Sequence, residues 1–179
     1  MTKERVDVLA YNQGLFDTRE QAKRGVMAGI VINALNGERF DKPGEKISDD
    51  LELMIKGEKL PFVSRGGLKL ARALQAFDIS VLDQTAIDIG SSTGGFTDVM
   101  LQNGAKLVYA VDVGTNQLAW EIRKDDRVVV MEQFNFRYAK PEDFSHDLPT
   151  FASIDVSFIS LALILPALYN ILLEGGQVV

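Results

Sequence analysis

Several kinds of residue and segment are missing from this sequence. It has no cysteine, so neither a disulfide framework nor a thiolate metal site can form, and we expect no metal centre. The longest apolar stretch, residues 158–168, includes Pro166 and is too short to span a bilayer, so we expect no membrane partner. Residues 1–8 mix charges with few apolar groups, which predicts no signal peptide. Together these features indicate a cytoplasmic protein.

Positive charge is scarce in the second part of the chain. The formal net charge of −6 argues against a protein that coats nucleic acid indiscriminately. Residues 1–70 carry 12 Lys and Arg and 11 Asp and Glu, whereas residues 71–179 carry the remaining 7 of 19 and 14 of 25. This difference suggests two modules, although ordinary variation of surface charge would also produce it.

Residues 1–59 have the pattern of a small domain. The second of two short helices is predicted to begin near Asp17 or Thr18, whose side chains can accept hydrogen bonds from first-turn amides, and to stop at Gly29. The expected elements are helices over 5–11 and 18–27, a strand over 30–32, and turns at 36–37 and 41–44. The apolar content is too small for a large core, so we expect a compact appendage, joined by a linker over residues 60–67.

Residues 68–179 alternate between apolar, β-prone segments and helical segments. The expected strands are 85–89, 107–112, 127–131, 151–156 and 177–179, with helices at 96–102, 116–124 and 160–173. The spacing of Leu70, Leu74 and Phe77 indicates one more helix ahead of them. This alternation predicts an α/β fold, a Rossmann-like, doubly wound parallel sheet. Because the sequence stops inside the fifth expected strand, we expect it to be a fragment of a longer protein.

The turn after the first of these strands is the most informative segment. A buried strand ends near Asp88, small residues follow, and a helix begins at Gly94-Gly95. Glycines let a ligand touch the backbone, and amides at a helix start favour an anionic group. Asp112 ends the next strand, where an acid can accept both hydroxyls of a ribose. A dinucleotide would require Gly-x-Gly-x-x-Gly directly after the strand, and its pyrophosphate would lie badly beside Asp88.

S-adenosylmethionine, which has an amino group and no phosphate, suits this turn better, and we predict it as the cofactor. The predicted cofactor-binding residues are Asp88, Gly90, Ser91, Ser92, Gly94, Gly95, Phe96, Asp112, Asn135 and Phe136. Asn135 and Phe136 follow the third strand, where adenine would lie, although core packing of Phe136 is an equal alternative. A glycine turn that serves only helix–strand packing is the alternative interpretation of the whole segment.

Three motifs then carry a resemblance to a known family. They are Ser-Arg-Gly-Gly-Leu-Lys-Leu at 64–70, Asp-Ile-Gly-Ser-Ser-Thr-Gly-Gly-Phe-Thr-Asp at 88–98, and Tyr-Ala-Val-Asp-Val-Gly at 109–114. With them, and over essentially its whole length, the sequence resembles the TlyA (hemolysin A) family of FtsJ-like methyltransferases. The resemblance implies ribose 2′-O-methylation of cytidine in ribosomal RNA, with ribosomal RNA or ribosomal subunits as partners.

The N-terminal part resembles a separate, RNA-binding module. Thr-Arg-Glu-Gln-Ala-Lys-Arg at 18–24 and Gly-Ile-Val at 29–31 are similar to the alpha-L RNA-binding domain of the ribosomal protein S-four type. Residues 33–35 depart from that pattern, because such domains pass from the strand directly into Asn-Gly. The predicted RNA-binding residues are Arg5, Arg19, Lys23, Arg24 and Arg65. An ordinary solvated face is the alternative interpretation of these charges.

FtsJ-like enzymes use a Lys-Asp-Lys-Glu tetrad, and the resemblance assigns its first two members to Lys69 and Asp155. The second lysine and the glutamate would fall after Val179. A lysine acts as a base only when it is neutral, and a neighbouring aspartate favours its charged form. We therefore expect residues 1–179 to bind cofactor weakly or moderately and to turn over poorly. Alternatively, Lys69 is a solvated charge and Asp155 only ends a strand.

Two other functions compete with an enzyme. One is a catalytically silent RNA-binding or ribosome-binding protein. The other is a membrane-active hemolysin, which has no support from a spanning segment, a signal peptide or an interfacial helix.

Overall fold

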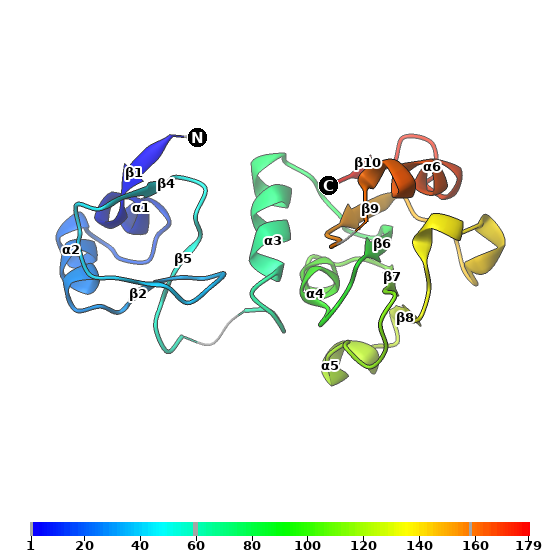
Figure 1. Cartoon of the computed structure of the whole chain (residues 1–179), viewed down its shortest axis with the longest axis horizontal. Coiled ribbons are helices and arrows are strands. Elements are labelled where there is room, and N and C mark those ends of the chain that lie inside the picture. The colour runs from blue at the N-terminus through cyan, green and yellow to red at the C-terminus, as the bar shows by residue number, and fades with distance from the viewer. Residues whose placement is uncertain (1, 59–60, 158) are drawn as a thin grey trace. The chain divides into compact units, whose positions relative to one another are not determined.

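The computed structural model describes residues 2–58, 61–157 and 159–179. The chain divides into two units, Met1–Pro61 and Phe62–Val179 (Figure 1). Residues 59 and 60, where the predicted first domain ends and the predicted linker begins, lie outside the described residues. Phe62 and Val63, from the segment predicted as a linker, pack against the core of the second unit. No helix among the described residues is long and apolar enough to cross a membrane.

The described residues of the first unit form two helices and five short strands. Its elements are β1 (Lys3–Arg5), α1 (Val6–Asn12), α2 (Arg19–Met27), β2 (Val31–Asn33), β3 (Arg39–Phe40), β4 (Lys46–Ser48) and β5 (Leu53–Ile55). β1 pairs with β4, and β2 lies between β3 and β5, all antiparallel. The Thr18 hydroxyl accepts a hydrogen bond from the Gln21 amide at 3.2 Å, which confirms the predicted start of α2.

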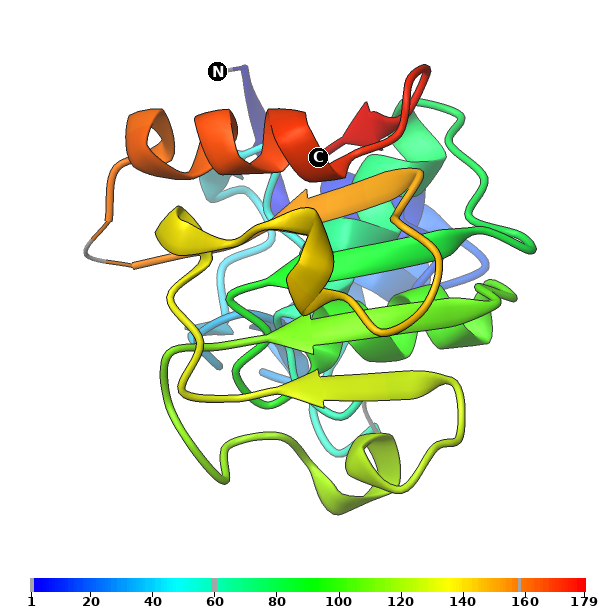
Figure 2. The ribbon, with the colours of Figure 1, turned by 90° about the vertical axis from the view of Figure 1, so that its right-hand side faces the viewer.

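The second unit is the predicted α/β domain. Its elements are α3 (Gly67–Ala76), β6 (Thr85–Ile89), α4 (Gly95–Gln102), β7 (Leu107–Val111), α5 (Trp120–Arg123), β8 (Val128–Met131), η1 (Phe136–Tyr138), η2 (Pro141–Asp143), β9 (Phe151–Ile154), α6 (Leu161–Ile171) and β10 (Gln177–Val178). The five strands form one parallel sheet in the order β10-β9-β6-β7-β8 (Figure 2). The chain order therefore reverses at β6, which lies between the next strand, β7, and the later strand β9. This reversal places a crevice at the carboxyl ends of the strands.

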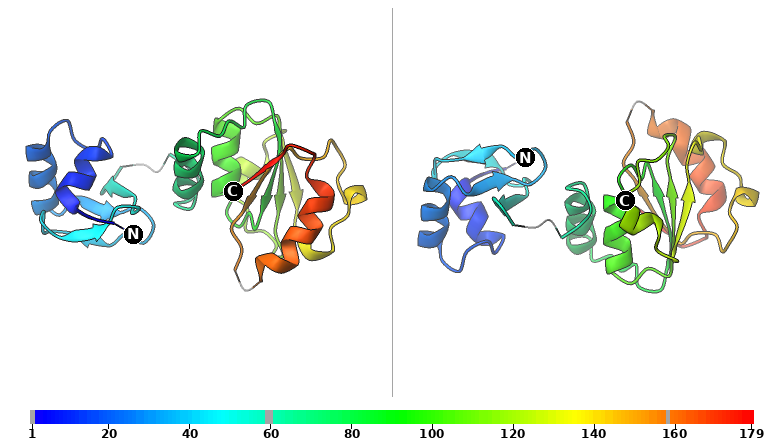
Figure 3. Two further views of the ribbon diagram at one scale, coloured as in Figure 1. Left: turned by 90° about the horizontal axis from the view of Figure 1, so that it is seen from above. Right: turned by 90° about the horizontal axis from the view of Figure 1, so that it is seen from below.

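Helices cover both faces of this sheet (Figure 3). Successive strand residues point to opposite faces, so Ala86 joins the apolar cluster formed with α3 and α4, whereas Ile87 joins the cluster formed with α6 and η1. Both layers are well filled, since Leu70 of α3 and Ile164 of α6 are each almost completely buried. The doubly wound architecture predicted from the sequence is confirmed.

Two helix predictions were wrong in detail. The helix expected over 116–124 is reduced to Trp120–Arg123, because Asn116 has a φ of +55° and Ala119 is extended. The helical spacing of Leu70 and Leu74 was extended to Phe77, but Phe77 follows the last residue of α3 and is 70% exposed. Backbone geometry thus delays the start of α5 and ends α3, where the apolar spacing alone would extend both helices.

Candidate functional site

The turn between β6 and α4 requires an unusual backbone. Gly90 has a φ of +85° and Gly94 a φ of +101°, a region that residues with side chains rarely adopt. A Cβ atom on Gly90 would also collide with the carbonyl oxygen of Asp155, which follows β9. The amide of Asp155 donates to the Ile89 carbonyl at 3.1 Å, which holds these two segments side by side. The small residues predicted to form the turn are thus needed for its shape.

Asp112 directly follows β7, beside this turn. Its Oδ2 accepts a hydrogen bond from the Ser92 amide at 2.8 Å, and its Oδ1 accepts one from the Gly114 amide at 2.8 Å. These two bonds fix the orientation of the carboxylate. Each carboxylate oxygen can accept a second hydrogen bond, so Asp112 retains capacity for a pair of hydroxyl groups.

A cavity of about 510 Å³ opens at the carboxyl ends of the strands, within the range of small-molecule sites. Of the predicted residues, it is lined by Gly90, Ser92, Asp112, Asn135, Phe136 and Asp155. Val113, Phe134 and Ile164 add apolar wall, although the sequence interpretation did not select them. The cavity therefore combines a carboxylate at one point with apolar surface that could cover a flat ring.

Five of the predicted cofactor residues do not line this cavity. Ser91, Gly94 and Gly95 are buried, and Phe96 packs partly against the cluster around α3 and α4. Gly95 also lies in close backbone contact with Gly67, so the first turns of α3 and α4 touch. These residues shape the turn and its helix from within. The fifth, Asp88, lies within β6.

Asp88 is completely buried in β6. Its Oδ2 accepts a hydrogen bond from the Thr97 hydroxyl at 2.8 Å, and its Oδ1 accepts one from the Ser153 hydroxyl at 3.5 Å. Burial raises the pKa of this carboxyl from 3.8 to about 7, against the lowering effect of its hydrogen bonds and with a smaller contribution from the negative charge of Asp155. Sequence interpretation missed Thr97 and Ser153, although Ser153 is the single polar residue of its apolar strand.

The structure brings Lys69 and Asp155 together. Lys69 lies in the first turn of α3, and its Nζ is 3.3 Å from Asp155 Oδ2. Both side chains are about half exposed, so the pair contributes at most about 1 kcal/mol to stability. Because Asp155 also lines the cavity, the ion pair lies at the cavity's edge.

The segment before α3 is held against α4 by a hydrogen bond. The Val63 amide donates to Asp98 Oδ2 at 2.8 Å.

The predicted RNA-binding residues occupy different settings. In the first unit Arg19, Lys23 and Arg24 are exposed on α2. Arg5 instead makes two hydrogen bonds to the buried Asp7 carboxylate, at 2.9 and 2.7 Å, and lowers the pKa of that carboxyl. In the second unit Arg65 is exposed, two residues before α3. Arg5 thus has a buried structural partner, whereas the three cations of α2 are exposed, with Arg24 in an ion pair of 3.9 Å with the likewise exposed Glu20.

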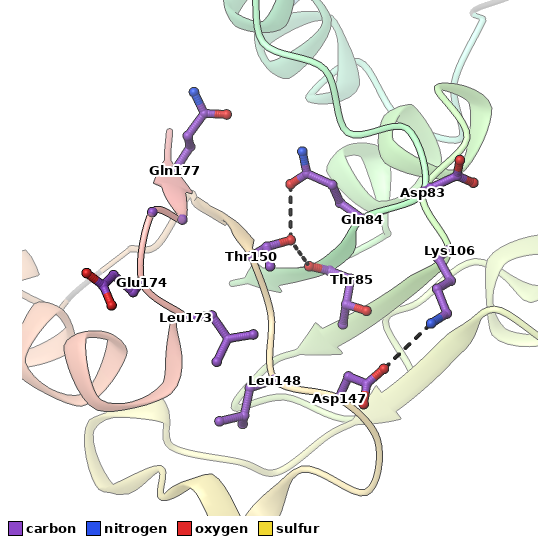
Figure 4. Close-up of a pocket in the computed structure, with 12 residues that line it drawn as sticks. Asp83, Gln84, Thr85, Lys106, Asp147, Leu148, Thr150, Leu173, Glu174 and Gln177 are labelled. Atoms are coloured by element: carbon purple, nitrogen blue, oxygen red, sulfur yellow. Dashed lines mark hydrogen bonds and ion pairs between the residues drawn. The ribbon is translucent and has the colours of Figure 1, made fainter.

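A second hollow, of about 730 Å³, opens at the opposite edge of the sheet (Figure 4). It lies at the amino end of β6, where the Thr150 hydroxyl donates to the Gln84 side-chain oxygen at 3.1 Å. Lys106 and Asp147 form an ion pair of 3.6 Å across part of it. This hollow contains none of the predicted site residues and none of the glycine turn.

Comparison with known proteins gives consistent matches. The family model for FtsJ-like methyltransferases matches residues 62–178. A Bacillus subtilis protein named "Putative rRNA methyltransferase YqxC" is 64% identical over 175 residues, which cover 98% of this chain and 62% of that protein. The Mycobacterium tuberculosis protein named "16S/23S rRNA (cytidine-2'-O)-methyltransferase TlyA" is 41% identical over 178 residues, 99% of this chain and 65% of that protein.

Among solved structures, one described as "Putative hemolysin from Streptococcus thermophilus" is 75% identical, with a TM-score of 0.68, over 99% of this chain and 65% of that one. This chain thus spans less than two thirds of the length of these three relatives. The family match itself extends over almost all of the second unit, from Phe62 onward. On this evidence the chain belongs to the FtsJ-like methyltransferase family, as the resemblance of its motifs predicted.

Proposed function

We propose that this chain binds S-adenosylmethionine in the cavity at the carboxyl edge of its sheet and methylates a ribose 2′-hydroxyl of cytidine in ribosomal RNA. The observation that carries the proposal is the position of the Lys69–Asp155 pair at the edge of a cavity that Asp112 also lines. The family match and the names of the relatives support the reaction and the type of RNA.

The chemistry of the cavity fits this cofactor. The Asp112 carboxylate would accept hydrogen bonds from the ribose hydroxyls, since each of its oxygens uses only one backbone donor. Phe136 and Ile164 would cover the adenine, with Asn135 available for a polar contact at its rim. The close approach of Gly90 to Asp155 leaves no room for a side chain at position 90. A ligand in the cavity would therefore contact the Gly90 backbone directly.

Lys69 and Asp155 would orient the acceptor ribose. When bound, S-adenosylmethionine would supply a methyl group on sulfur; its carbon–sulfur bond would break as the carbon–oxygen bond forms, and the hydroxyl proton would pass to solvent water. A charged Lys69, held by Asp155, can hydrogen-bond the ribose oxygen but cannot remove its proton. Orientation alone gives part of the rate, so we expect residues 1–179 to transfer methyl groups slowly.

Binding of the cofactor can be tested by calorimetry with S-adenosylmethionine. We expect Asp112→Ala to weaken binding by at least about tenfold, because a charged hydrogen-bond acceptor is lost. Asp126→Ala removes an exposed aspartate before β8 and serves as the matched control, with affinity unchanged. Equal binding by the wild type and Asp112→Ala would contradict the proposed site.

Transfer can be tested with radiolabelled cofactor and ribosomal RNA or ribosomal subunits. The expected product is RNA that carries the labelled methyl group on the 2′-oxygen of cytidine. Cofactor binding without any label in RNA would favour the catalytically silent RNA-binding alternative.

RNA binding would use the exposed cations of α2. Arg19 and Lys23 are one helical turn apart and Arg24 is adjacent, so their charges can contact successive phosphates. We expect the double variant Lys23→Glu, Arg24→Glu to weaken RNA binding and to reduce the slope of log affinity against log salt by about 2. The double variant Lys106→Glu, Lys124→Glu makes the same change of charge in the second unit. If the salt slope fell equally in both double variants, α2 would not be the specific RNA-binding surface.

A further inference from the structure

We propose that Asp88 is a positioning residue for the cofactor cavity: from beneath the glycine turn, its carboxyl group fastens the first turn of α4 and the end of β9 to β6. The inference deepens the proposed function, since it rests on the cavity being the cofactor site. Sequence interpretation assigned Asp88 to direct cofactor contact, but its side chain is completely buried and is not among the residues that line the cavity.

The contact with α4 replaces a missing helix cap. The first amides of a helix have no partners within the helix, and a side chain at the N-cap usually accepts one of them. The N-cap of α4 is Gly94, which has no side chain and a φ of +101°. Asp88 supplies the acceptor instead, because it binds both the hydroxyl of Thr97, at 2.8 Å, and the backbone of the same residue. Gly94 is thereby free to adopt the conformation that the turn requires.

The contact with β9 connects Asp88 to the ion pair. Ser153 lies opposite Asp88 in the parallel pairing of β6 and β9, and its hydroxyl donates to Asp88 at 3.5 Å. Two residues later the chain reaches Asp155, which lines the cavity and pairs with Lys69. A single buried carboxyl group therefore contacts α4, which follows the glycine turn, and β9, which leads to Asp155 at the cavity.

The strength of these hydrogen bonds depends on the charge of Asp88. Ionised, the carboxylate accepts all of these hydrogen bonds strongly, whereas a protonated carboxyl is a weaker acceptor. Because burial places its pKa at about 7, the change falls in the neutral range. The other titratable groups on the elements around it are Lys69 and Arg72 of α3, Asp98 of α4, Tyr109 of β7, Asp112 after β7 and Asp155 after β9. Of these, the negative charge of Asp155 acts on Asp88.

The first test is calorimetry with S-adenosylmethionine and with S-adenosylhomocysteine between about pH 6 and about pH 8. We expect the wild-type affinity for both to rise with pH through about 7. Asp88→Asn should bind about tenfold more weakly at the upper pH and show no such rise. The control is Asp83→Asn, an exposed residue before the same strand whose φ of +56° asparagine also tolerates. Wild-type affinity and pH profile in Asp88→Asn would overturn the proposal.

A second variant separates positioning from general loss of structure. Thr97→Val removes the hydroxyl that binds Asp88, and Thr97→Ser restores it. We expect Thr97→Val to weaken binding of S-adenosylmethionine and Thr97→Ser to recover most of it. Equal weakening in both variants would contradict a role for this hydrogen bond.

Hydrogen exchange gives a result that does not depend on the cofactor. The amides of residues 90–97 should exchange faster in Asp88→Asn and Thr97→Val than in the wild type, while those of β7 and β8 stay protected. If the wild-type protein bound neither ligand, the proposed function would fail, and exchange rates would still decide whether Asp88 holds the turn. Unchanged exchange at residues 90–97 in both variants would overturn the positioning role.

Discussion

The two edges of the parallel sheet differ in how their hollows are built. The larger hollow, about 730 Å³ at the amino edge, is bordered by solvated side chains such as the Lys106–Asp147 pair. The smaller one, about 510 Å³ at the carboxyl edge, is bordered by the backbone of Gly90, packed closely against the Asp155 carbonyl, and by a carboxylate held by two amides. The difference indicates that closely packed backbone and a fixed polar group, rather than volume, distinguish the proposed binding site from a surface recess.

The largest effect should come from adding one methyl group to a glycine at each edge. Gly90→Ala introduces a Cβ that collides with the Asp155 carbonyl at a φ of +85°, so we expect a loss of at least about 3 kcal/mol of folding stability. Gly175→Ala at the amino edge meets no atom within 4 Å at a φ of +78°, and only the backbone strain of about 1 kcal/mol remains. Urea unfolding measures both values. Equal losses would mean that the carboxyl edge is no more constrained than the amino edge.

The second effect is a dependence of stability on pH that only the carboxyl edge should have. The pKa of Asp88 is raised in the folded state from 3.8 to about 7, so folding favours its protonated form. Its contribution to stability is complete below about pH 4 and is lost as the pH rises through about 7. We expect Asp88→Asn to remove up to about 1 kcal/mol per pH unit of this decline.

Urea unfolding at several pH values, with Asp83→Asn at the other end of β6 as the control, measures this difference. A decline of the same steepness in Asp88→Asn and in the wild type would assign it to other groups.

The smallest effect on stability compares the two exposed ion pairs. Lys69–Asp155 and Lys106–Asp147 are both at least about half exposed, so Lys69→Met and Lys106→Met should each change stability by less than about 0.5 kcal/mol. Their effects on methyl transfer should nevertheless differ, because only Lys69 lies at the edge of the proposed cofactor cavity. Single-turnover transfer to RNA should be lost in Lys69→Met and kept in Lys106→Met. If Lys69→Met still transferred the methyl group, Lys69 would have no role in the reaction.

Much of the second unit could be predicted because each strand carries its own signal. The apolar, β-branched segments predicted all five strands of the parallel sheet, and the small residues after β6 predicted the turn. Burial could not be predicted in the same way. Asp88 and Asp112 both occur at or near the end of an apolar strand, yet one is completely enclosed and the other lines the cavity. Which face of the sheet each side chain occupies, and what covers that face, depends on helices that are distant in sequence.

The ion pair shows a second limit. Lys69 and Asp155 are 86 residues apart, and nothing in the local sequence of either residue indicates the other. They were assigned together only through the family resemblance, and their proximity depends on the close backbone contact of Gly67 with Gly95. The start of α5 is a third case, because the positive φ of Asn116 interrupts a spacing that would otherwise favour an earlier start of the helix.

The central claim is that the carboxyl edge, and not the amino edge, holds the cofactor. A titration of the ¹⁵N-labelled chain with S-adenosylmethionine, followed by NMR, tests it directly. We predict that the amide signals of Gly90, Ser92 and Gly114 shift with a single binding curve, while those of Gly104 and Gly175 remain in place. Shifts confined to Gly104 and Gly175, or no shift at Ser92 and Gly114 at saturating ligand, would contradict the account.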